Sequence, residues 1–193
     1  MYNSKLRKRD AKALQEYLDT ALISHPLFMY YCPDKSKRAK YIDAFLGYHL
    51  PKWAKTGSVF IGPNKRSAAA LIAKEDFEFF FIGARSLPLL LIASGTRERL
   101  HRKVTKNIVG VLVPSGMPVK VLTIFGDSLK DKDDIMVLVK QAAQQAKEEN
   151  FVLVYETFSR RIIPDMEKLG FETGYQRNFM DTRFIQTLMT FNI

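Results

Sequence analysis

One carboxylate, Glu156, stands where it could take part in proton transfer. It follows the segment FVLVY (151–155), whose five residues are apolar, and Thr157 comes directly after it. A carboxylate in this place can act as a general base, and it can equally hold a neighbouring loop. Both roles stay open at this point, and the adjacent Tyr155 is a second candidate for proton transfer.

The other residue types that do chemistry form no local motif. His25, His49 and His101 are too far apart in the sequence for a local metal motif, and structural roles are expected for all three. The single cysteine, Cys32, excludes an internal disulfide framework and a cysteine-rich zinc site. No G-x-S-x-G or P-loop sequence is present. No metal is expected.

The last third of the chain predicts the elements that would position Glu156. Residues 119–125 are rich in β-branched side chains and predict a strand, and residues 151–157 predict a strand that is buried on both faces. A helix is expected to begin at Asp133 or Asp134. A second, short helix is expected between Ser159 and Gly170, followed by a hairpin of two strands, 171–179 and 183–191.

The first part of the chain predicts two helices, a hairpin and a less readable middle. Asp10 and Asp34 are expected to cap the helices, with His25-Pro26 ending the first one. A hairpin is expected over 57–73. The run from Phe77 to Ala93 fits a helix or a strand, and Thr96 to Asn107 predicts a helix. Taken together, residues 1–193 predict a single domain of mixed α/β class.

Two separated segments resemble the GNAT superfamily of acyl-CoA-dependent N-acyltransferases. The segment VYETFSRRIIPDMEKLGFE (154–172) resembles the closing motif of that superfamily, a strand that ends in Glu-Thr, a short helix and Leu-Gly-Phe-Glu. Residues 14–61 are similar to the beginning of one of its branches, which has a His-Pro-Leu step, Pro-Asp with an arginine, and Gly-x-Val-Phe after the second helix. The resemblance covers most of the chain, more loosely between about 75 and 115.

The resemblance implies a twisted, mostly antiparallel sheet, flanked by helices, in which two central parallel strands splay apart. The pantetheine arm of acetyl-CoA would enter between strands 119–125 and 151–157, held by the backbone of Thr123, Ile124 and Phe125. The pyrophosphate would rest on the N-terminus of the helix that follows, where free N–H groups favour anions. The loop positions implied for this contact are Lys130, Lys132 and Asp134.

The chain departs from the family pattern at the positions that carry function. The family loop reads Gln/Arg-x-x-Gly-x-Gly/Ala, whereas here Leu129 stands at its first position, Lys130 at its second, and Lys132 and Asp134 at its two glycine positions. Met166 stands where many members have a tyrosine that can protonate the leaving thiolate. Tyr155, Tyr175 or a water molecule could substitute for it.

Net charge is the unusual feature of the composition. The 193 residues include 30 Lys+Arg and 20 Asp+Glu, a formal charge of +10. Basic residues cluster near the N-terminus, at the start of the second predicted helix and on the middle helix, where Arg99 and Lys103, and Arg102 and Lys106, share faces. These helices could meet an anionic partner, although no nucleic-acid module accompanies them and nucleic-acid binding is not the leading expectation.

The sequence leaves two functions open. The first is an N-acetyltransferase that moves an acetyl group from acetyl-CoA to an amine of unknown identity, on a small molecule or a protein. The second is a non-catalytic binding or regulatory protein, a pseudoenzyme that keeps this fold without the usual CoA site. In either case we expect a cytoplasmic protein without membrane contact, since no apolar stretch is long enough to span a bilayer.

Overall fold

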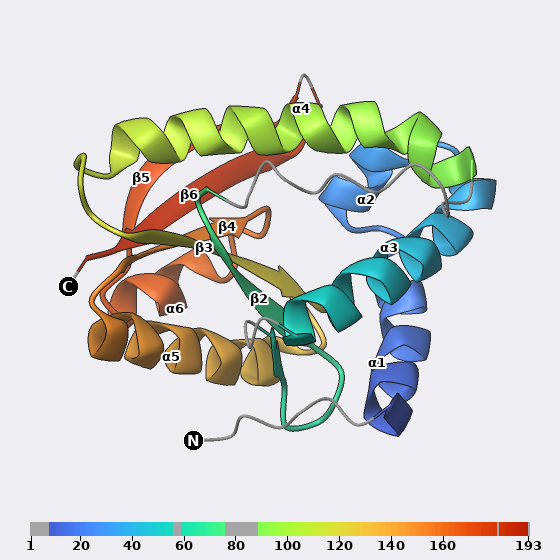
Figure 1. Ribbon diagram of the computed structural model, residues 1–193, viewed down its shortest axis with the longest axis horizontal. Helices are drawn as coiled ribbons and strands as arrows, with labels where there is room; N and C mark the ends of the chain where they lie inside the picture. The colour runs from blue at the N-terminus through green and yellow to red at the C-terminus, as the bar shows by residue number, and fades with distance from the viewer. Residues whose placement is uncertain (1–7, 56–58, 76–88, 181, 193) are drawn as a thin grey trace.

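The computed structural model describes residues 8–55, 59–75, 89–180 and 182–192. They form one central sheet with helices around it (Figure 1). The sheet has six strands in the order β1-β2-β3-β4-β6-β5. Among the described strands, β3 and β4 pair in parallel and every other neighbouring pair is antiparallel. The fold is therefore mixed α/β, as expected from the sequence. The strands are β1 (Val59–Ile61), β2 (Ala68–Ala73), β3 (Val119–Phe125), β4 (Val152–Thr157), β5 (Glu172–Asn178) and β6 (Ile185–Phe191).

Helices cover the two faces of the sheet unequally. In Figure 1, α4 lies along the upper side of the sheet with α2 and α3 beside it, and α5 and α6 lie along the lower side. Strand residues alternate between the two cores, because successive side chains point to opposite faces. Val121 and Val154 pack with the core of α1–α4, and Leu122 and Leu153 pack with α5 and α6. The helices are α1 (Lys8–Ala21), α2 (Pro26–Tyr31), α3 (Lys35–Lys55), α4 (Leu89–Leu112), α5 (Lys132–Glu149) and α6 (Ile163–Lys168).

Most predicted elements are confirmed, with differences at the helix ends. The strand over 119–125 is confirmed without change. The prediction that Asp10 caps the first helix is wrong, because α1 already begins at Lys8. The helix predicted over 96–107 is longer at both ends, as α4. Residues 76–88, most of the ambiguous apolar run, lie outside the described residues.

His25-Pro26 was predicted to end the first helix, but α1 ends earlier, at Ala21, and Pro26 begins the short helix α2. Proline at the first position of a helix loses no hydrogen bond, because that N–H would have no partner inside the helix. His25 caps α2, where its Nδ1 accepts a hydrogen bond from Leu27 N at 3.3 Å. The sequence missed α2 because the same dipeptide is a valid signal for a helix end and for a helix start.

Two arginines that the sequence grouped with surface cations lie inside the protein. Arg38 is 6% exposed, and its guanidinium donates to the backbone oxygens of Ile23, Cys32 and Pro33 at 2.8–2.9 Å. Arg102 is also 6% exposed and is bonded to Glu98. The prediction that Arg102 shares an exposed cationic face with Lys106 is therefore wrong.

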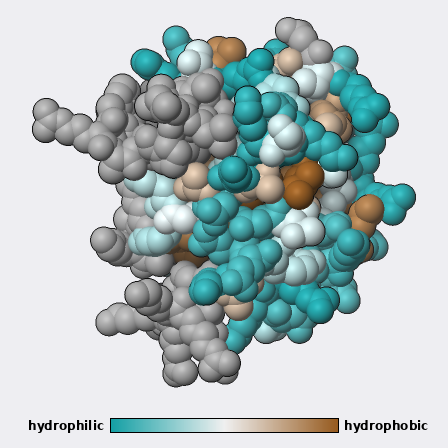
Figure 2. Space-filling model, turned by 90° about the vertical axis from the view of Figure 1, so that its right-hand side faces the viewer, coloured by the Kyte–Doolittle hydropathy of each residue, from teal (hydrophilic) through white to brown (hydrophobic). Residues whose placement is uncertain are grey.

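The remaining surface over the N-terminal helices is mostly hydrophilic. Figure 2 shows this end of the molecule, where hydrophobic side chains reach the surface only in small, separate spots. Among the described helices, none is both long enough and apolar enough to cross a membrane.

Candidate active site

The two parallel strands at the centre of the sheet diverge at their carboxyl ends. β3 and β4 stay paired from Val119↔Val152 to Leu122↔Tyr155. Beyond that point β3 follows β2, with Phe125 opposite Ala68, and β4 follows β6, with Thr157 opposite Thr187. Each strand remains bonded to its antiparallel neighbour, so a fork opens between them. The fork confirms the predicted splayed pair.

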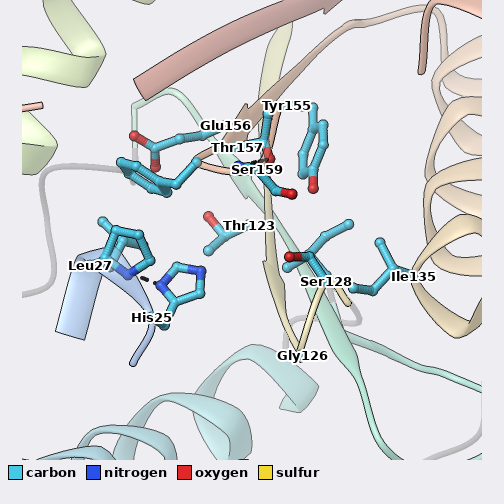
Figure 3. Close-up of a pocket in the computed structure, with 13 residues that line it drawn as sticks. His25, Leu27, Thr123, Gly126, Ser128, Ile135, Tyr155, Glu156, Thr157 and Ser159 are labelled. Carbon is cyan, nitrogen blue, oxygen red and sulfur yellow. Dashed lines mark hydrogen bonds between the residues drawn. The ribbon is translucent and has the colours of Figure 1, made fainter. Parts of the chain in front are cut away.

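A cavity of about 80 Å³ lies in this fork. Figure 3 shows three groups of side chains around it: the beginning of α2 on one side, the end of β4 opposite, and the segment that joins β3 to α5. Successive side chains of a strand point to opposite faces of the sheet, so side chains from both faces line the cavity at the strand ends. Its lining consists of His25, Pro26, Leu27, Thr123, Ile124, Gly126, Ser128, Ile135, Tyr155, Glu156, Thr157, Phe158 and Ser159.

Glu156 is the charged side chain of this lining, and it is buried. Its carboxylate is 2% exposed, on the face of the sheet that α4 covers. Its Oε1 accepts hydrogen bonds from His101 Nε2 at 2.8 Å and Gln186 Nε2 at 2.5 Å, with Thr105 Oγ1 at 3.4 Å. Among the described residues, no hydrogen bond is made to Oε2, which leaves that oxygen for a ligand or for water.

Glu156 stays ionised in spite of its burial. Burial favours the neutral acid and raises the pKa, but the charge and hydrogen bond of His101 and the hydrogen bond of Gln186 together outweigh it and lower the pKa of Glu156. A buried anion with one oxygen unused is costly unless a partner meets it. Such a group in a cavity is a candidate for function.

His101 connects Glu156 to a tyrosine on the opposite side of its ring. Tyr31 Oη lies 2.6 Å from His101 Nδ1, and the Tyr31 side chain is buried. On one side of the ring Nε2 contacts the Glu156 carboxylate, and on the other side Nδ1 contacts the Tyr31 hydroxyl. The order hydroxyl, imidazole, carboxylate is the order that orients a histidine in nucleophilic and acid–base sites.

A second buried ion pair lies next to this chain of hydrogen bonds. Arg102 Nε and its terminal nitrogen both lie 2.9 Å from Glu98 Oε1, and His49 Nε2 lies 3.7 Å from the same oxygen. A small cavity of about 10 Å³, close to the size of one water molecule, lies between the aromatic core and Arg102, His101 and Glu156. Glu156 thus lines both cavities.

His25 presents a neutral ring to the fork. Burial disfavours the imidazolium and lowers the pKa of His25 to about 4, although the charge of Glu156 acts in the opposite direction. Because Nδ1 accepts from Leu27 N, the ring proton resides on Nε2. His25 therefore offers an N–H donor at the side of the cavity opposite the end of β4 (Figure 3).

The loop between β3 and α5 is bonded to its own carboxylates. Asp127 Oδ1 accepts from the backbone N–H groups of Leu129 at 2.9 Å and Lys130 at 3.3 Å. Asp131 Oδ2 accepts from Asp127 N at 3.1 Å. The Tyr17 hydroxyl lies 2.8–2.9 Å from both oxygens of Asp131. Aspartate side chains thus take three N–H groups of this loop, whereas the side chain of Asp131 makes no capping hydrogen bond to the first turn of α5.

Asp134 supports the turn between β1 and β2. Its Oδ1 accepts from Asn64 N and its Oδ2 accepts from the Ser67 hydroxyl, both at 3.0 Å. Gly62 is required beside it, because an added Cβ would lie 2.1 Å from Asp134 Oδ2. The side chain that replaces a family glycine therefore has a structural contact of its own.

The other predicted site residues divide into two groups. Thr123, Ile124, Tyr155 and Glu156 line the fork cavity, and Phe125 lines only the small inner one. Lys130 and Lys132 are not part of either lining among the described residues. They form ion pairs at 3.8 Å with Asp127 and at 2.5 Å with Asp165, respectively.

Met166, which stands at the position of the family's tyrosine, lies in the core. It is 0% exposed and packs in the core beneath α5, together with Ile162, the residue before α6. Tyr155 points to that same face, and burial raises its pKa to about 12, so the phenol keeps its proton.

Sequence reasoning missed the partners of Glu156. His101 and Thr105 come from α4, and Gln186 comes from β6. One signal was available: His101 and Thr105 are four residues apart and share a helix face, which pointed inward. The arginines and lysines around these two residues hide the signal, because they are typical of a solvated helix.

Comparisons of the chain with protein-family models and with curated proteins found no match. The fork cavity and its buried carboxylate are therefore the basis on which a function is assigned.

Proposed function

We propose that this protein is a cytoplasmic N-acyltransferase that moves an acetyl group from a pantetheine thioester, such as that of acetyl-CoA, to an amine. The observation that carries the proposal is the fork between β3 and β4, which opens next to the buried, ionised Glu156. The backbone of β3 from Thr123 to Phe125 is not paired with β4 there. The GNAT resemblance assigns that stretch of backbone to the amides of the pantetheine arm.

A thioester supplies an acyl carbon that an amine can attack, and the residues of the fork would handle the protons. Glu156 attracts the amine as an ammonium ion and holds it near the fork, where the ammonium first gives one proton to water, so that the neutral amine can attack the thioester. As the C–N bond forms, the nitrogen becomes strongly acidic, and Glu156 Oε2 accepts its proton even though the pKa of Glu156 is low. His101 and Gln186 keep Oε1 bonded and thereby fix the direction of Oε2.

Water would protonate the leaving thiolate. The Tyr155 phenol has a pKa of about 12, so it holds its proton more tightly than a thiol does. Glu156 therefore carries the proton transfer, and Tyr155 lines the cavity. His25 Nε2–H can donate to an oxygen bound in the cavity, the type of contact that stabilises a developing oxyanion.

A second candidate function is a non-catalytic protein that binds a small amine or an acyl compound in the fork. Two observations favour it. Carboxylates of Asp127 and Asp131 take loop N–H groups, and Met166 replaces a proton donor. In this case the fork would bind its ligand without breaking a bond.

Acyl transfer can be tested with two thioesters and one variant. The protein is incubated with acetyl-CoA or acetyl-pantetheine and a panel of primary amines, and both the free thiol and the N-acetyl product are measured. We expect an N-acetyl product from at least one thioester. Glu156→Gln should lower the rate by about 100-fold or more, because a general base contributes this order of magnitude.

A matched control separates loss of the base from loss of a charge. Glu167 is exposed on α6, so Glu167→Gln should leave the rate unchanged. Thermal unfolding of Glu156→Gln checks that the variant is folded. Binding of a thioester without transfer to any amine would reject the enzyme in favour of the second candidate.

A further inference from the structure

The β3–α5 loop conflicts with one part of acetyl-CoA. The fork suits the pantetheine arm, whereas the pyrophosphate would have to approach residues 126–134. In that stretch the N–H groups of Asp127, Leu129 and Lys130 are already bonded to carboxylates. An incoming phosphate would have to displace these bonds before it could accept any of them.

The charges of the loop oppose the same approach. The stretch holds four aspartates and two lysines, a formal charge of −2. Each lysine already faces a carboxylate, Lys130 that of Asp127 at 3.8 Å and Lys132 that of Asp165 at 2.5 Å, so part of its charge is offset locally. Like charges within a few ångströms repel strongly, and salt screens them little at that distance.

The loop is also fixed from outside. Asp131 is 4% exposed, and the Tyr17 hydroxyl of α1 donates to its carboxylate, 114 residues away in the sequence. Asp134 is 3% exposed and is bonded to the β1–β2 turn. Moving these carboxylates out of the way would leave buried polar groups without partners, which is costly. The acidic conformation of the loop is therefore a stable part of the fold.

From these contacts we infer that the acyl donor is a pantetheine thioester without the nucleotide portion of coenzyme A. This inference rests on the proposed acyl transfer and names the donor for it. In the reaction the acyl C–S bond breaks and a C–N bond forms. The neutral amine attacks, the proton that its nitrogen then loses goes to Glu156 and from there to water, and the pantetheine thiolate takes a proton from water. The same chemistry is offered by a free acyl-pantetheine and by a pantetheine arm attached to a carrier protein.

The experiment compares kcat/KM for three donors with one amine acceptor. The donors are acetyl-CoA, acetyl-pantetheine and an acetylated carrier protein. We expect at least one of the two donors without a nucleotide to equal or exceed acetyl-CoA. A tenfold or larger preference for the carrier over acetyl-pantetheine identifies the carrier as the source, and a smaller difference identifies the free thioester.

The possible failures are distinguishable. If acetyl-CoA is at least tenfold better than both other donors, the inference about the donor is overturned and the proposed acyl transfer stands. If no donor supports transfer, the proposed function fails together with the inference.

A loop variant provides a second measurement. Asp127→Asn keeps an oxygen that can accept from Leu129 N and Lys130 N, and it removes one negative charge. It should raise kcat/KM for acetyl-CoA about twofold to threefold and leave acetyl-pantetheine unchanged. Glu148→Gln, an exposed change at the other end of α5, should affect neither donor. Equal effects of Asp127→Asn on both donors would overturn the inference.

Discussion

His25 caps a helix and lines a cavity at the same time. Its Nδ1 caps α2, and this bond places the ring proton on Nε2 at the wall of the fork. The ring packs edge-on against Phe28 and Phe158, which limits its access to water. A neutral ring is therefore built into the native state.

The low pKa of His25 predicts a specific loss of stability in acid. The pKa falls from 6.5 to about 4 on folding, so the unfolded chain binds more protons between these values. The contribution to stability is complete above pH 6.5 and is lost as the pH falls towards 4, at most about 3 kcal/mol. His25→Asn keeps a capping oxygen and removes the titration.

Unfolding of the wild type and of His25→Asn in urea, measured from pH 7 to pH 4, checks this prediction. The free energy of unfolding of the wild type should fall relative to that of the variant across this range. Parallel curves for the two proteins would show that His25 does not titrate abnormally.

Glu156 illustrates what single residues reveal in a sequence. Its place after an apolar run predicted a carboxylate at the end of a central strand, and the structure has it there. Its partners could not be predicted, because His101 is 55 residues away and lies on a helix whose register against the sheet no local pattern fixes. Whether a carboxylate holds a loop or faces a cavity depends on those partners.

At the scale of elements, the strands were more predictable than the helix ends. A strand such as β4 can be predicted from its continuous apolar run, because a strand that is buried on both faces needs apolar residues on both. The fork was predicted only through the family resemblance, because it depends on which neighbour each strand follows. Arg38 shows the opposite difficulty, because its sequence neighbours Lys35, Lys37 and Lys40 are exposed cations while it is buried.

Arg38 is predicted to hold the N-terminal helices together. Arg38 lies in α3, and its guanidinium donates to one backbone oxygen that follows α1 and to two backbone oxygens that follow α2. A lysine has the charge but not the planar fork of donors, so Arg38→Lys should leave buried oxygens unbonded. We expect the free energy of unfolding to fall by about 2–4 kcal/mol.

Urea unfolding with circular dichroism measures this loss. The control is Lys40→Arg, an exposed change of the same two residue types on the same helix, which should shift stability by less than about 0.5 kcal/mol. If the two variants are equally stable, the three hydrogen bonds of Arg38 do not anchor the helices.

At the scale of the whole molecule, the net charge of +10 is unevenly distributed around the site. The loop beside the fork is acidic, whereas the outer side of α4 is basic. From Thr96 to Leu112 the acidic residue is Glu98, which is buried against Arg102, while Arg99 and Lys103 are exposed. The anionic partner predicted from the sequence would therefore meet α4, away from the β3–α5 loop.

This distribution predicts a local and salt-dependent affinity for polyanions. The protein is loaded on heparin and eluted with increasing salt, because each cation that contacts the polymer releases counterions. The double variant Arg99→Glu/Lys103→Glu should elute at clearly lower salt than Lys140→Glu/Lys147→Glu, which changes the net charge equally on the exposed side of α5. An equal shift for both variants would mean that heparin responds to total charge and that α4 is no special surface.

Retention on duplex DNA no stronger than on heparin would fit a charged helix face, since base recognition needs contacts that charge alone does not supply.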